Sequence, residues 1–154
     1  FMDVGIAEET AAAIASGIAV NGGRPVWGVY STFVQRAYDQ ISQDICINNS
    51  PATIVTFSGS VYGMNDVTHL GLYDIPMLSN IPNLVYLAPT TKEEYLAMLD
   101  WSIEQTEHPV AIKLPGGEMV SDGKQITKDF SALNKYEMTE SCIYRTWNIL
   151  FSCR

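Results

Sequence analysis

Short apolar runs alternate along most of the chain with longer segments whose apolar residues recur at helical spacing. The runs expected to form strands are rich in β-branched residues and span 24–30, 52–57, 84–89 and 109–115. Helices are expected over 10–20, 31–49, 72–82 and 90–106. Strands that alternate with helices favour parallel pairing. The pattern therefore predicts an α/β fold, a three-layer, mostly parallel sheet with helices on both faces.

Residues typical of helix ends mark several of these boundaries. They are Gly22-Gly23 after the first helix, Ser31 or Thr32 before the second, and Thr90 or Thr91 with Glu93 and Glu94 at the start of the last. Between the second strand and the third helix lies Ser58–Gly71, which contains three glycines. A loop of this length and composition is typical of a functional site.

The character of the chain changes after Gly117. We predict one domain over 1–117, a polar, turn-rich linker over 118–141, and an atypical tail over 142–154 that holds two cysteines and no acidic residue. A frameshift, a truncated gene model or a natural truncation would each produce such a tail. The chain also begins at Phe1 directly before a strand-like segment, so we interpret it as a fragment of a longer protein.

Composition narrows the class of protein. A net charge of -8 argues against a general nucleic-acid or anionic-membrane surface. The longest uncharged apolar run, Thr10–Val20, is too short to span a bilayer and lacks the basic start of a signal peptide. Cys46, Cys142 and Cys153 have no metal-like spacing, so we expect reduced thiols and a cytoplasmic protein.

The residues alone indicate a small-molecule site rather than a named chemistry. The chain has no phosphate-binding glycine motif and no nucleophile elbow, and its two histidines, His69 and His108, are not spaced as a metal pair. Ligands of open α/β sheets bind beyond the carboxyl ends of the strands. The polar groups in such positions are Glu8, Tyr30–Phe33 with Arg36, Thr68-His69 and Lys113–Gly117.

Four motifs in order carry a sharper signal: "DVGIAEE", "VYSTFVQRAYDQ", "THLG" and "IPNLVYLAP". With "PVAIKLP" they cover residues 1–117, which resemble the pyrimidine-binding domain of the transketolase family of thiamine diphosphate enzymes. Within that family the run is similar to the 1-deoxyxylulose-5-phosphate synthases. The resemblance implies the thiamine diphosphate-binding fold and a transferase that cleaves and forms carbon–carbon bonds through a carbanion at C2 of the cofactor.

The resemblance implies a catalytic role for Glu8, whose carboxyl group would contact N1' of the cofactor's aminopyrimidine ring. A carboxyl group in a low-dielectric pocket holds a proton more readily, which suits such proton sharing. The alternative is an acidic residue favoured at a helix N-terminus by the helix dipole. Glu9, which matches a family glutamine, keeps that second interpretation.

Four more site residues follow from the resemblance. Phe33 matches the aromatic residue that stacks on the pyrimidine, and Tyr30 and Arg36 would line the same pocket. His69 matches a catalytic histidine that faces the substrate. The alternatives are a helix-face core position for Phe33, a surface ion pair for Arg36 and a hydrogen-bonded loop histidine for His69. His108, which precedes Pro109, is expected to be an exposed turn residue.

The chain departs from the synthases where they bind the substrate phosphate. Their two phosphate-binding arginines correspond to Ser58 and Gly116, and their loop aspartate corresponds to Asn65. Arginine suits phosphate through its fork geometry, which neither serine nor glycine can replace. Lys113 is a nearby cation that matches neither arginine. The substrate, a small sugar phosphate or a 2-oxoacid, is therefore left open.

Part of the cofactor site is expected to lie outside this sequence. The family holds the diphosphate and Mg²⁺ on a separate domain through a G-D-G…N motif, which is absent here, so no metal ligands are assigned. The partner would be a second copy of the chain, a diphosphate-binding domain, or both. Ala13 and Gly17, four residues apart, would permit close packing against such a partner, or within the domain's own core.

We therefore predict the pyrimidine-binding half of a thiamine diphosphate site that is inactive alone and binds the cofactor weakly or not at all. The alternatives are another transketolase, a 2-oxoacid dehydrogenase E1 β-type subunit, or a non-catalytic α/β domain kept for dimerisation or regulation.

Overall fold

The computed structural model describes residues 1–59, 66–123 and 126. Most of the predicted linker and all of the predicted tail, including Cys142 and Cys153, lie outside the described residues. The helical elements are α1 (Glu8–Val20), η1 (Phe33–Ala37), α2 (Tyr38–Gln40), η2 (Ile41–Ile47), η3 (Val67–His69), α3 (Asp74–Leu78) and α4 (Lys92–Glu104). The strands are β1 (Val26–Tyr30), β2 (Thr53–Phe57), β3 (Val85–Leu87) and β4 (Val110–Lys113). Each predicted strand is present and slightly shorter than the apolar run that predicts it.

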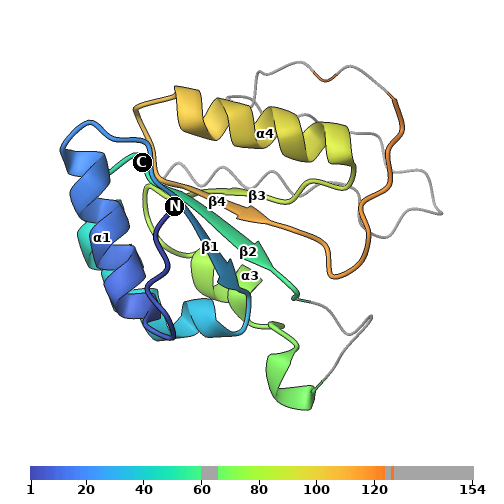
Figure 1. The fold of residues 1–154 in the computed structure, drawn as a ribbon, viewed down its shortest axis with the longest axis horizontal. Helices are drawn as coiled ribbons and strands as arrows, with labels where there is room; N and C mark the ends of the chain where they lie inside the picture. Colours follow the sequence, from blue (N-terminus) through green and yellow to red (C-terminus); the bar gives the residue numbers. More distant parts are fainter. Residues whose placement is uncertain (60–65, 124–125, 127–154) are drawn as a thin grey trace.

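The strands form one parallel sheet in the order β1-β2-β4-β3 (Figure 1). Val26 of β1 pairs with Thr53 of β2, and Thr53 pairs with Val110 of β4, so these strands begin at one level. Ser31 extends the β1–β2 ladder by donating its N–H to the Phe57 carbonyl at 2.8 Å. Because all the strands are parallel, their carboxyl ends meet at one edge of the sheet.

Helices cover the sheet on both faces, which confirms the three-layer prediction. Side chains of α1, η1, η2 and α3 pack on one face against Val29, Ile54, Tyr86 and Ala111. On the other face, Ala97 and Met98 of α4 pack against residues of β3 and β4 (Figure 1). Alternate residues of each strand point to opposite faces of the sheet. Because odd and even positions of the central strands are both apolar, both faces of the sheet have to be covered.

The second predicted helix is not a regular α-helix. It runs as a 3₁₀ segment, one short α turn and a π segment over Phe33–Ile47, although its apolar residues lie in the core as predicted. The predicted side-chain cap is wrong: Thr32 lies at the N-cap in helical conformation, and its side chain makes no capping hydrogen bond. The Ser31 and Thr32 hydroxyls are instead buried without a partner in the described structure.

Two other predicted helix ends are confirmed. After α1, Gly22 adopts a left-handed φ of 81° and donates to the Ala19 carbonyl, while Gly23 donates to that of Ile18. This pair of bonds caps the orphan carbonyls of the helix, as in a Schellman motif. At α4 the Thr91 side chain accepts from the Glu94 N–H, and Glu94 returns a bond to the Thr91 N–H, which completes the capping box.

Two further features of the described residues are a buried cysteine and the lengths of the helices. Cys46 carries a free, buried thiol, and burial raises the pKa of that thiol to about 12, so the thiolate form is disfavoured. None of the helices in the described residues is both long and apolar enough to cross a bilayer.

Candidate functional site

Glu8 and Arg36 form an ion pair at the N-terminus of α1. One Arg36 guanidinium nitrogen lies 3.3 Å from Glu8 Oε2. The Glu8 side chain is 12% exposed, whereas that of Arg36 is 49% exposed. Glu9, the adjacent residue, is exposed. The helix therefore turns the two neighbouring carboxyl groups to different environments, and only Glu8 faces other site residues.

Phe33 lies at the centre of an aromatic cluster next to this pair. The Arg36 guanidinium carbon lies 5.2 Å from the centre of the Phe33 ring, and the His69 ring meets Phe33 edge-on with 5.2 Å between ring centres. Tyr30 meets Phe33 edge-on with 5.9 Å between ring centres, and packs against Phe57 in a tilted arrangement with 4.7 Å between ring centres. The five residues predicted from the sequence thus form one continuous set of contacts, although they come from three separate segments.

His69 ends the single 3₁₀ turn η3, which Asp66 caps. Asp66 Oδ1 accepts a hydrogen bond from the Thr68 N–H at 2.9 Å, and the Thr68 hydroxyl lies 2.8 Å from His69 Nδ1. Hydrogen bonds from Thr68 lower the pKa of Asp66, with a smaller contribution from His69. His69 is exposed, so its ring is accessible to a ligand from solvent while the Thr68 hydroxyl fixes its orientation.

A cavity of about 280 Å³ lies between η1 and the η3–α3 segment. Its walls are part polar and part apolar, and include Ser31, Thr32, Gln35, Thr68, Tyr73 and Met77. The buried hydroxyls of Ser31 and Thr32 have no partner in the described structure. Buried hydroxyls normally bind a protein group, an ordered water or a ligand, so the cavity is suited to a polar group.

A buried ion pair lies at the same end of the sheet; the sequence pointed to Lys113 in such a position, but not to its partner Asp74. Lys113, at the end of β4, binds the carboxylate of Asp74, the first residue of α3. The sequence offered only a weak signal, a lysine that ends an apolar strand and an aspartate within a largely apolar segment. Their pairing depends on the fold, because the two residues are 39 positions apart.

Two of the three positions that depart from the synthases lie in the described structure. Ser58 follows β2 and adopts a left-handed φ of 57°, a conformation that is uncommon for residues other than glycine. Gly116 follows β4 and is partly buried. Asn65 lies outside the described residues. Among the described residues, no three His, Cys, Asp or Glu side chains lie close enough together to hold a metal ion.

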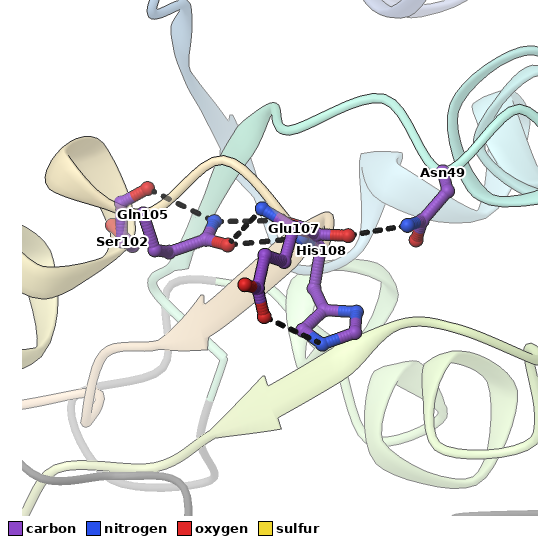
Figure 2. A network of polar contacts seen from close by, with 5 residues as sticks. All are labelled: Asn49, Ser102, Gln105, Glu107 and His108. Carbon is purple, nitrogen blue, oxygen red and sulfur yellow. Dashed lines mark hydrogen bonds and ion pairs between the residues drawn. The ribbon is translucent and has the colours of Figure 1, made fainter.

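His108 lies away from this site, in the turn between α4 and β4. Figure 2 shows how the Gln105 side chain closes this turn: Nε2 donates to the carbonyls of Ser102 and His108, and Oε1 accepts from the N–H groups of Glu107 and His108. Asn49 donates to the Glu107 carbonyl and joins the neighbouring loop to the turn. The side chain of His108 is exposed, as predicted for a turn residue.

The first helix leaves part of its small-residue face open. Ala13 is exposed, and a Cβ added at Gly17 would meet no atom within 4 Å. The face that packs into the core consists instead of Ala11, Ala12, Ala15, Ser16 and Ala19. Close packing of Ala13 and Gly17 within the domain's own core, the second of the two alternatives, is therefore wrong.

Comparison with known proteins shows the class of protein to which this fold belongs. Residues 1–119 match the family model for the transketolase pyrimidine-binding domain, so the chain belongs to this family. The chain is 44% identical over 138 residues to 1-deoxy-D-xylulose-5-phosphate synthase of Clostridium tetani. This match covers 90% of the chain and 22% of that enzyme. It is 45% identical over 117 residues to the synthase of Trichormus variabilis, and this match covers 76% of the chain and 18% of that enzyme.

Solved structures agree on the fold. A split-gene transketolase, described as an inactive β4 tetramer, superposes with a TM-score of 0.68 at 23% identity and covers 82% of this chain and 42% of its own. Transketolase from Pichia stipitis, in complex with sedoheptulose 7-phosphate, gives a TM-score of 0.72 at 23% identity. The match covers 79% of this chain and 18% of the Pichia chain. The chain spans about a fifth of the length of the curated synthases that it matches.

Proposed function

We propose that this chain provides the pyrimidine-binding half of a thiamine diphosphate site in an enzyme of the 1-deoxyxylulose-5-phosphate synthase kind. The observation that carries the proposal is the contact set that joins Glu8, Arg36, Phe33 and His69 at the carboxyl edge of the sheet. Family membership and the similarity to the synthases support the same conclusion.

The residues present fit a flat, nitrogen-containing ring. Phe33 offers an aromatic surface that is only partly buried, and Glu8 offers a carboxylate that is largely shielded from solvent. The unpartnered hydroxyls of Ser31 and Thr32 can bind polar atoms beside it. When bound, thiamine diphosphate supplies a nucleophilic carbon and an electron sink for carbon–carbon bond cleavage and formation.

Each residue then has a distinct task. Glu8 holds a proton at a ring nitrogen of the aminopyrimidine, and Arg36 keeps one Glu8 oxygen in place through the 3.3 Å ion pair. Phe33 stacks on the ring, and Tyr30 supports Phe33 from its edge. His69, oriented by Thr68, faces the substrate and stabilises charge or transfers a proton there.

The remaining half of the site comes from a partner in this proposal. The Mg²⁺ that accompanies a diphosphate needs oxygen ligands from the protein in addition to the phosphate oxygens, and these would lie on a diphosphate-binding domain of the same or another chain. The substrate is a small sugar phosphate or a 2-oxoacid. We expect the chain alone to bind thiamine diphosphate weakly or not at all in isothermal titration with Mg²⁺, and tight binding without a partner would contradict this division of the site.

The decisive test compares Glu8→Gln with Glu9→Gln in the chain assembled with its diphosphate-binding half. Both substitutions remove one carboxylate from adjacent positions, so they match in charge and in their effect on the helix. Loss of proton transfer at the ring should lower cofactor-dependent turnover by about 100-fold or more for Glu8→Gln and leave Glu9→Gln near the parent rate. Full turnover in Glu8→Gln would refute the catalytic role of Glu8 and with it the proposal.

A further inference from the structure

The Lys113–Asp74 ion pair lies at the point where four segments of the chain converge. Lys113 ends β4, and its side chain is 15% exposed, whereas the Asp74 side chain is fully buried. The second Asp74 oxygen accepts the N–H of Ile75 at 2.8 Å, so both carboxylate oxygens have a partner. Charged side chains are rarely buried this deeply unless they are paired. The pair therefore joins the end of β4 firmly to the start of α3.

The backbone packs tightly around this pair. A Cβ at Gly59, just after β2, would lie 2.9 Å from Lys113 Nζ and 2.5 Å from Ser31 Oγ. A Cβ at Gly71 would lie 2.5 Å from the Cβ of Ser31 and 3.1 Å from the Cα of Gly59. Figure 1 draws α3 near the arrowheads of β1 and β2, at the end of the sheet where Asp74 of α3 binds Lys113. The segment between His69 and Asp74 thus rests directly on the ends of β1 and β2.

Buried hydroxyls extend the polar cluster under α3. Thr56, the register partner of Lys113, and Tyr86 of β3 both have buried oxygens without a partner in the described structure. Burial, and then the Asp74 carboxylate, raise the pKa of Tyr86, so the Tyr86 hydroxyl keeps its proton beside the ion pair. The cluster is built into the sheet rather than placed on an exposed surface.

Among the described residues, the segment that carries His69 has few other anchors. Asp66, Val67, Thr68, His69, Leu72 and Tyr73 are all exposed, whereas Asp74 is 2% exposed. Exposed backbone with few buried contacts opens easily unless it is held at its ends. The Asp66 cap closes the η3 turn within the segment, whereas the Gly71 contact and the Asp74 ion pair attach its carboxyl end to the sheet.

We propose that Lys113 and Asp74 are positioning residues that hold the His69 segment over the carboxyl ends of β1 and β2, and so fix the His69 ring against Phe33. The inference rests on the proposed function for the catalytic importance of His69, but not for the mechanical link. Lys113, neutralised by Asp74 and largely buried, acts here through the segment and not as a ligand for a substrate anion.

The test uses the full chain and follows backbone amide exchange by NMR in Asp74→Asn and Lys113→Met, with Lys113→Arg as the variant that retains the charge. Thr53→Val serves as the matched control, because it removes a buried hydroxyl that binds Ser102 on the opposite face of the sheet. We expect exchange at residues 68–73 to rise about tenfold or more in Asp74→Asn and Lys113→Met, beyond any change in the amides of β2. The shift that the Phe33 ring current causes in the His69 resonances should decrease in the same two variants. Lys113→Arg, which keeps the charge, should retain much of this shift and of the parent's slow exchange at residues 68–73.

If Asp74→Asn and Lys113→Met raised amide exchange equally at residues 68–73 and in β2, as Thr53→Val is expected to do, the proposal would be overturned. The ion pair would then contribute only to overall stability. If Lys113→Met does not fold, the comparison of Asp74→Asn with Lys113→Arg gives the same decision. A shift of the Lys113 resonances with millimolar inorganic phosphate in the parent chain would assign Lys113 to anion binding and also overturn it. Because these signals do not require turnover, an inactive Glu8→Gln enzyme and a loosened His69 segment are separate results.

Discussion

Asp66 shows how one side chain can make the site sensitive to acid. Because Thr68 hydrogen bonds lower its pKa in the folded chain, Asp66 contributes stability that is fully present above its unfolded pKa of about 3.9. That contribution is lost as the pH falls through the lower folded value. We expect the Thr68 and His69 amide resonances to report loss of the η3 turn in this acid range.

The control for this prediction is Asp66→Asn, which keeps an oxygen acceptor for the Thr68 N–H and does not titrate. In this variant the acid-dependent shift of the Thr68 amide should disappear. An unchanged acid transition in Asp66→Asn would assign the effect to another carboxyl group.

At this scale the sequence distinguishes types of residue better than their partners. The motifs that contain Glu8 and Phe33 could be recognised in the sequence, and both residues lie at the candidate site. The direct partners of Arg36 were not visible, since Arg36 contacts Glu8 across 28 positions and also covers Phe33. Ion-pair partners are set by the packing of distant segments, which residue type alone does not encode.

At the scale of elements, the turn between α4 and β4 depends on a single amide side chain. Gln105 makes four hydrogen bonds to backbone groups of the turn, and Asn49 attaches the loop before β2 to it (Figure 2). Each such hydrogen bond makes a modest net contribution to stability, so the turn is weakened when the side chain that makes them is removed. The turn therefore holds the amino ends of β2 and β4 in register.

Gln105→Ala should lower the free energy of unfolding by about 2 kcal/mol, since each lost bond contributes about 0.5–1.5 kcal/mol and water replaces some of them. Urea denaturation followed by circular dichroism measures the change. Gln43→Ala, at an exposed glutamine of η2, is the matched control and should stay within about 0.5 kcal/mol of the parent. Equal effects of the two substitutions would show that the network adds no stability.

Local sequence signals worked well for elements whose ends have specific chemistry. Gly22-Gly23 and the Thr91–Glu94 box each satisfy backbone groups within their own helix, so neighbouring residues suffice to predict them. The helix start expected at Ser31 or Thr32 does not follow this rule. The hydroxyls of these two residues lie at the cavity instead of capping a helix, and the backbone after them changes from 3₁₀ to π geometry. Tertiary contacts there override local preference.

At the scale of the whole molecule, the open face of α1 is the feature that bears on assembly. Ala13 and Gly17 are exposed, and the helix bears its core contacts on another face. Small exposed residues let a second helix approach closely, which suits a partner that completes the cofactor site. Gly17→Ala should raise the free energy of unfolding of the chain alone by up to about 1 kcal/mol, because alanine favours the helix.

Gly17→Phe should in contrast weaken assembly, since the larger side chain would occupy the space of the partner. Sedimentation velocity of the chain, alone and with the diphosphate-binding half, measures the effect. Leu96→Phe, at an exposed position of α4, is the control for added aromatic surface. Normal assembly of Gly17→Phe would place the interface elsewhere on the molecule.

The sequence by itself determined the order of the strands and helices along the chain, the family, and the five predicted residues that gather at the carboxyl edge of the sheet. Those features follow from hydrophobic period and from short motifs, both of which are local. Only the tertiary structure decided the strand order β1-β2-β4-β3, the pairing of Arg36 with Glu8 and the pairing of Lys113 with Asp74. These depend on register and on the packing of segments far apart in the chain, and a one-residue shift in register would place each side chain on the opposite face.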